Sequence, residues 1–128
     1  MQRQPTVVGL KLCQHAIVQE KTRNVTLVNC FRKLAFSTFP APARTFTVCA
    51  VLTNGLGDGE LTLSMISLED LEYVWTHSWK ATFKDPLKEL WFLMPVAACR
   101  FPKAGRYQAG LAIDGEPAAQ TVLQVLSV

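Results

Sequence analysis

FPKAGRYQAGLAIDGEPAAQTVLQV, residues 101–125, is the stretch that decides the fold, because it has the pattern of a β-hairpin. Apolar residues alternate with small or polar ones over residues 107–113, which is the period of a half-buried strand. Asp114-Gly115 follows, and this pair favours a two-residue type I′ turn because both residues tolerate positive φ. Residues 121–125 then return as the partner strand.

Segments with the same period recur along the rest of the chain. The longest is residues 73–83, where one set of side chains alternates strictly with another, as in a strand and not in a helix. With the hairpin, the chain contains about eight strands, which predicts an all-β fold, an antiparallel β-sandwich with immunoglobulin-like Greek-key connections. The other predicted strands are residues 7–14, 25–31, 45–53, 60–68 and 87–93.

The connections between these segments allow more specific predictions. Residues 45–53 and 60–68 flank a glycine-rich stretch and are predicted to form a second hairpin. Residues 25–31 are almost continuously apolar, which favours a central strand. Residues 36–44 contain two prolines, so we expect them to cross between the sheets, with their two phenylalanines closing one end of the core.

Length, composition and charge exclude several classes of protein. A chain of 128 residues predicts one domain, residues 1–128, and 49% hydrophobic against 18% charged residues argues against disorder. The net charge of +3 comes from scattered basic residues, so no nucleic-acid partner is expected. No apolar stretch is long enough for a transmembrane helix and no secretory signal is visible, which predicts a cytoplasmic protein without a membrane partner. Cys13, Cys30, Cys49 and Cys99 form no Cys-x-x-Cys pair and are expected to be free thiols, and no cofactor is expected.

Two resemblances add to this interpretation. The segment around Gly105 and Tyr107 resembles the tyrosine corner of immunoglobulin-like domains, with Ala109 at the place of the cysteine, which implies that no intersheet disulfide forms. The whole chain resembles a family of small bacterial proteins catalogued as a domain of unknown function. The residues that carry this likeness are Thr26 to Phe31, Phe39-Pro40, Phe101-Pro102, Gly105, Tyr107 and Asp114-Gly115-Glu116. They are turn, corner and core positions, so the resemblance implies a β-sandwich and transfers no catalytic residue.

Trp75, His77 and Trp79 form the main candidate site, because they share one face of the same predicted strand. Exposed on a sheet, these aromatic side chains could stack on sugars or bases. Tyr73, Ala81 and Phe83 share that face, however, and an apolar face of period two ordinarily points into the core. The pattern favours the core over a ligand site.

Other possible sites are weaker. Cys13, His15 and Cys30 suggest at most an incomplete zinc site, because their spacing matches no metal-binding signature. The acidic residues of the turns are typical of solvated loops. With two histidines and no nucleophile motif, no catalytic set can be named, so we expect that the protein is not an enzyme.

The function predicted from these features is a non-catalytic module for protein interaction or assembly. Its partner would be another protein or a second copy of the chain, as in a homodimer, because Val51, Ile66 and Val74 place apolar side chains on faces that are usually polar. The alternative is a carbohydrate-binding sandwich that uses exposed tryptophans, Trp75, Trp79 or Trp91.

Overall fold

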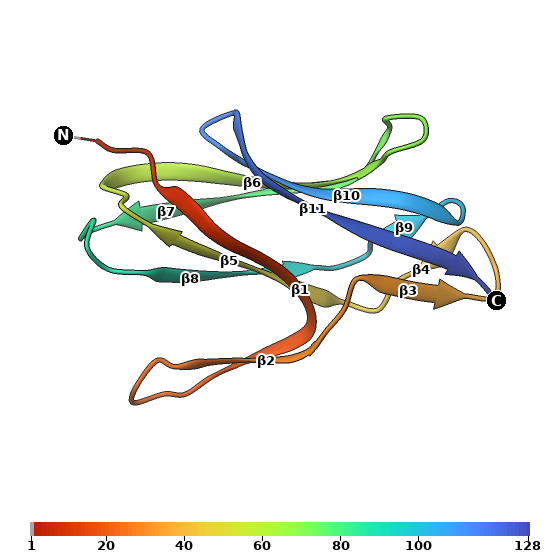
Figure 1. The fold of residues 1–128 in the computed structure, drawn as a ribbon, viewed down its shortest axis with the longest axis horizontal. Coiled ribbons are helices and arrows are strands. Elements are labelled where there is room, and N and C mark those ends of the chain that lie inside the picture. The colour runs from red at the N-terminus through yellow and green to blue at the C-terminus, as the bar shows by residue number, and fades with distance from the viewer. Residues whose placement is uncertain (1) are drawn as a thin grey trace.

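The computed structural model describes residues 2–128, and this part of the chain consists of strands joined by turns and loops (Figure 1). The all-β prediction is confirmed, although the strands number eleven and several are short. No helix in this part of the chain has the length and apolar character needed to cross a membrane. The strands are β1 (Thr6–Val18), β2 (Val25–Cys30), β3 (Lys33–Phe36), β4 (Ala41–Pro42), β5 (Phe46–Thr53), β6 (Gly57–Ser67), β7 (Tyr73–Phe83), β8 (Leu90–Val96), β9 (Arg100–Phe101), β10 (Gly105–Ile113) and β11 (Glu116–Ser127).

The strands form two large sheets and one small ribbon. The four-stranded sheet has the order β2-β1-β5-β8, and the five-stranded sheet has the order β3-β11-β10-β6-β7. β4 and β9 pair with each other as a separate ribbon. Every pairing is antiparallel except that of β3 with β11, which is parallel.

The two large sheets contribute to a single hydrophobic core. In β5, Val48, Ala50 and Leu52 are fully buried and point to the same face, as alternate residues of a strand do. In the five-stranded sheet, β6, β10 and β11 supply a further layer of apolar side chains to the same core. The main members of that layer are Leu61, Leu63, Met65, Tyr107, Ala109, Leu111, Ile113, Leu123 and Val125.

The hairpin predicted from residues 101–125 is confirmed as β10 and β11, which pair from Gly105↔Val125 to Ile113↔Glu116. Its turn is Asp114-Gly115, where both residues have positive φ, 50° and 84°. A β-bulge lies between Leu111 and Ala112 and shifts the register near the turn. At the other end of the hairpin, the Tyr107 hydroxyl donates a hydrogen bond of 2.6 Å to the Lys103 carbonyl.

The predicted hairpin of residues 45–53 with 60–68 is wrong. β5 belongs to the four-stranded sheet and β6 to the five-stranded sheet, so the glycine-rich connection leads from one sheet to the other. Gly55 is buried in this connection, and a side chain there would collide with the ring of Phe83. Both strands contribute side chains to the same core from different sheets, so each has the alternation expected of a hairpin strand.

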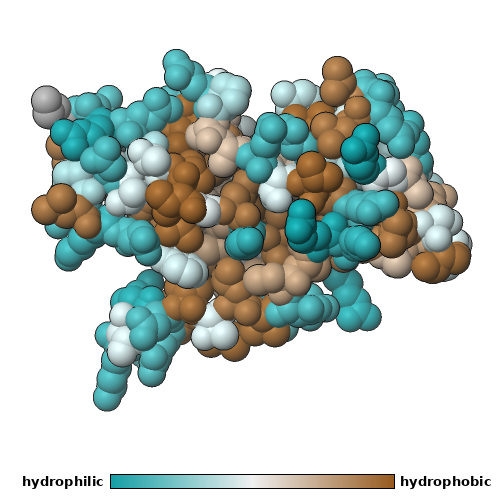
Figure 2. Space-filling model, viewed as in Figure 1, coloured by the Kyte–Doolittle hydropathy of each residue, from teal (hydrophilic) through white to brown (hydrophobic). Residues whose placement is uncertain are grey.

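The prediction of a central strand at residues 25–31 is also wrong, because β2 lies at the edge of its sheet and pairs only with β1. The end of the β1–β2 hairpin is hydrophilic and projects from the body, whereas hydrophobic residues gather at its base (Figure 2). Residues 36–44 do connect the two sheets, and Phe36 and Phe39 pack against the core as expected. Pro40 follows a cis peptide bond in this crossing.

Candidate functional site

The structure brings Trp75, His77 and Trp79 together as an aromatic ladder along β7, the edge strand of the five-stranded sheet. The three rings are mutual neighbours, with His77 4.6 Å from Trp79 and 6.2 Å from Trp75 by ring centroids, and the two indoles 6.4 Å apart. Trp79 also meets Phe92 of β8 edge to face at 6.4 Å. Because β8 is the edge strand of the other sheet, the ladder lies where the two sheets meet along one side of the core.

The exposure of this face changes along the strand. Ala81 and Phe83 are buried, Trp75 and Trp79 are half-buried, and His77 is exposed. Tyr73, at the start of β7, is 68% exposed, so the expectation that it shares a core face is wrong. The register shifts beside Tyr73, where Val74 is the extra residue without a partner on β6, so this β-bulge in β7 turns Tyr73 away from the core face. The indole of Trp75 is held by a hydrogen bond of 2.8 Å from its Nε1 to the Ala97 carbonyl.

The outer faces of the two large sheets differ in character. That of the five-stranded sheet carries polar pairs across β6 and β7, where hydroxyl groups bond between Thr62 and Ser78 and between Ser64 and Thr76. That of the four-stranded sheet is apolar, and we call it the outer apolar face. Its side chains alternate with core residues of β5 and β8 and are paired by the register as Val51↔Trp91, Cys49↔Leu93 and Thr47↔Pro95.

Of the apolar residues predicted to point outward, one lies on an outer face and another packs against the core. Val51 lies on the outer apolar face as expected, half-buried between Gly9 and Trp91. Val74 packs against the core at the β6–β7 bulge, so its outward placement is wrong. Trp91, 40% exposed, and Leu93 were not predicted to belong to this face. Their alternation with Leu90, Phe92 and Met94 is the sequence signal that could have identified them.

Three free cysteines lie beneath or within the outer apolar face. Cys13 and Cys30 are direct cross-strand partners, and Cys49 lies on the next strand. Burial, with Cys30 as a smaller cause, raises the pKa of Cys13, and burial raises the pKa of Cys49 to about 11. His15 pairs with Val28 and is exposed, and among residues 2–128 no three His, Cys, Asp or Glu side chains gather as metal ligands. The buried thiols therefore act as small apolar side chains.

We expect the free energy of unfolding to fall as the pH rises above about 9. The expected slope is roughly 1.4 kcal/mol per pH unit for each buried thiol whose pKa is raised in the folded chain. Burial raises the pKa of Cys49 to about 11 and that of Cys99 to about 12, above the ordinary thiol value. The folded chain therefore keeps protons that the unfolded chain releases, so this stability is complete below the ordinary thiol pKa and is lost toward pH 11. Urea denaturation between about pH 8 and about pH 10 measures the slope. If the free energy of unfolding falls equally with pH in the protein and in the Cys49→Ala, Cys99→Ala double variant, the loss does not come from these two thiols.

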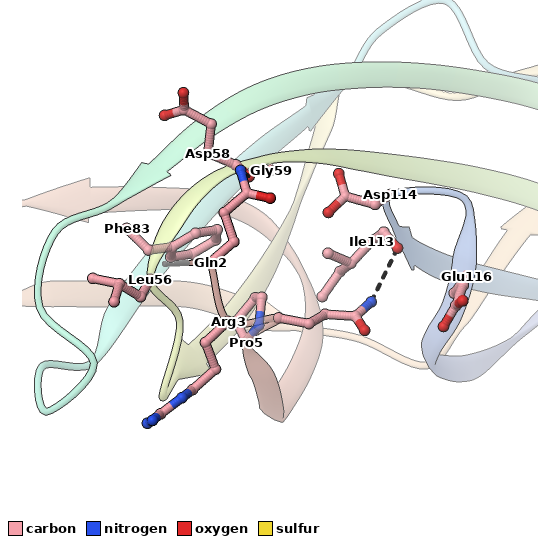
Figure 3. Close-up of a pocket in the computed structure, with 11 residues that line it drawn as sticks. Gln2, Arg3, Pro5, Leu56, Asp58, Gly59, Phe83, Ile113, Asp114 and Glu116 are labelled. Atoms are coloured by element: carbon pink, nitrogen blue, oxygen red, sulfur yellow. Dashed lines mark hydrogen bonds between the residues drawn. The ribbon is translucent and has the colours of Figure 1, made fainter.

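A polar pocket of about 200 Å³ lies between the N-terminal residues, the start of β6 and the β10–β11 turn (Figure 3). Gln4 Nε2 donates to the Ile113 carbonyl at 3.1 Å, while the Arg3 guanidinium points away from the pocket and bonds to Asn54. The Asp114 carboxylate accepts a hydrogen bond from the backbone N–H of Glu60. These contacts attach the N-terminal segment to β10 and to the β5–β6 connection, and the hairpin turn to β6, which is a structural role.

The family model of a family of unknown function, DUF6941, matches residues 10–126. The chain belongs to this family. The match covers all the strands of both large sheets except the ends of β1 and β11, so the part of the resemblance that concerned a domain of unknown function is confirmed. No curated protein matches the chain.

Proposed function

We propose that this DUF6941 protein is a non-catalytic assembly module that self-associates through the outer apolar face. The observation that carries the proposal is the contrast between the two sheets. One carries paired hydroxyl groups on its outer face, where the exposed Val122 lies across from the polar Gln108, and the other exposes or half-exposes Val51, Trp91 and Leu93 beside Pro95. Contiguous apolar surface on a soluble sheet is typical of a protein interface.

A second copy of the chain is the simplest partner for this face. A two-fold dimer places the same patch on both subunits, so an apolar patch is complementary to itself, whereas one of like charges is not. Lys11 lies within the face beside Cys49, and the Glu89 carboxylate accepts a hydrogen bond of 2.9 Å from the Trp91 indole. Two exposed residues of β1, Val8 and Ile17, extend the apolar surface toward the rim.

Light scattering after size exclusion, over a range of concentrations, tests the proposal. We expect a dimer mass at high concentration and at least about a tenfold weaker dimer for Val51→Lys, because one buried charge without a partner costs more than 1.4 kcal/mol. Val122→Lys is the matched control, since this exposed valine lies on the outer face of the other sheet, and it should leave the mass unchanged. A monomer at every concentration would refute self-association.

The proposal extends to the kind of fold and the compartment. It assigns an immunoglobulin-like Greek-key sandwich, which the hydrogen bond from Tyr107 to the backbone four residues upstream supports. It assigns a bacterial, cytoplasmic protein, supported by the family resemblance and by free cysteines that are mostly buried. The lack of catalysis is supported by the separation of the two histidines, His15 and His77, on different sheets.

Carbohydrate binding is the second candidate, and the half-buried indoles of Trp75 and Trp79 favour it. Their rings lie 6.4 Å apart by centroid along an open sheet edge, where a sugar ring could stack on an aromatic face. Quenching of tryptophan fluorescence by soluble polysaccharides would support this function over assembly. Unchanged fluorescence across such a panel would exclude it.

A further inference from the structure

A second recess, distinct from the outer apolar face and from the aromatic ladder, opens where β1, β3 and the β4–β5 connection meet. Its volume is about 360 Å³, within the range of pockets that hold small organic ligands. Its walls come from both large sheets, since Phe46 belongs to β5, and Leu34 and Phe36 belong to β3. Phe31 and Pro42 complete the apolar lining.

Contacts between aromatic rings hold the phenylalanines that line this recess. Phe31 meets Phe46 edge to face at 5.5 Å, and Phe46 is itself almost fully buried in the core. Phe36 is held by Phe39 and Phe101 at 6.3 and 6.1 Å. The recess therefore has a fixed floor, while Phe31, Leu34 and Phe36 remain only half-buried and present apolar surface to an incoming molecule.

The charge at the recess is positive. Arg44 lines it and is exposed, and no acidic side chain of residues 2–128 forms an ion pair with Arg44. The surrounding sequence is also cationic, because residues 21–57 contain five lysines or arginines and no aspartate or glutamate. Gln14 and Thr45 add neutral hydrogen-bonding groups to the lining.

We infer that this recess binds a small organic acid, with its apolar body against the phenylalanines and its anionic group at Arg44. An arginine matches a carboxylate or sulfonate through two parallel hydrogen bonds, and the lack of a competing acidic residue leaves this guanidinium available. A neutral apolar molecule would gain only the contacts with the walls. A cation would meet Arg44 with like charge.

Fluorescence titration with anilinonaphthalene sulfonate, an aromatic body with one anionic group, tests the inference. We expect saturable binding of one molecule per chain and displacement by decanoate, but little displacement by decanol, which has the same chain without the charge. Arg44→Gln should weaken binding at least about tenfold, since a hydrogen bond to a charged group is lost. Thr45→Trp, in the loop before β5, should also weaken binding by filling part of the recess.

Matched variants separate this site from other apolar surface. Arg106→Gln makes the same change at an exposed position of β10 and should bind the probe as the unmodified protein does. Val51→Lys alters the outer apolar face and should also leave binding unchanged, so failure of the dimer would not affect this result. Equal displacement by decanoate and decanol, or unchanged affinity in Arg44→Gln, would overturn the assignment of an anionic ligand. Absence of saturable binding would overturn the site itself.

Discussion

Phe101→Ala is expected to lower the free energy of unfolding by about 4 kcal/mol, the middle of the range for phenylalanine truncation in a core. The Phe101 side chain is fully buried, and its ring meets Tyr107 edge to face at 4.9 Å. It also belongs to the β4–β9 ribbon, where it pairs with the buried Ala41. With Phe36 of β3, whose ring lies 6.1 Å away, three separate parts of the chain would therefore border the cavity, and little of it can collapse.

Urea denaturation followed by tryptophan fluorescence measures this loss. Phe39→Ala is the matched control, because the same atoms are removed from a half-buried ring at the same end of the core. We expect this control to lose about half as much stability, in proportion to the area that it buries. A loss below about 1 kcal/mol for Phe101→Ala would show that the end of the core rearranges without it.

The strands and the β10–β11 hairpin could be predicted from the sequence because the signals that specify them are local. Alternation over residues 73–83 and the Asp114-Gly115 pair each depend on neighbours along the chain, and the structure contains both features. The pairing of strands is not a local property. β5 and β6 have the alternation of a hairpin but belong to different sheets, and only the long-range register with β1 and β10 distinguishes these arrangements.

The candidate sites show the same limit. The sequence grouped Trp75, His77 and Trp79 correctly, since a period of two places them on one face, but it could not specify their exposure. That exposure depends on β7 being an edge strand and on Phe92 lying across from Trp79. The recess at Arg44 could not be predicted for the same reason, because its lining combines residues 14, 31–36 and 42–46 from both sheets.

Trp79→Ala is expected to lower the free energy of unfolding by about 2 kcal/mol, roughly half the cost of a fully buried tryptophan. The Trp79 indole is half-buried and joins the edges of the two large sheets through Phe92. Its strand partner is Leu61, which is fully buried, so the indole covers the border of the core. Its loss would expose that border to water.

His77→Ala is the control within the same ladder. Its ring lies closest to Trp79, but the side chain is exposed, so we expect a change within about 0.5 kcal/mol.

Thermal or urea unfolding of both variants, together with fluorescence titration by polysaccharides, separates the two interpretations of the ladder. A large loss of stability for Trp79→Ala without any sugar binding would identify the ladder as the wall that closes one side of the core. Unchanged stability with lost sugar binding would instead make it a ligand site, and carbohydrate recognition would then replace assembly as the proposed function.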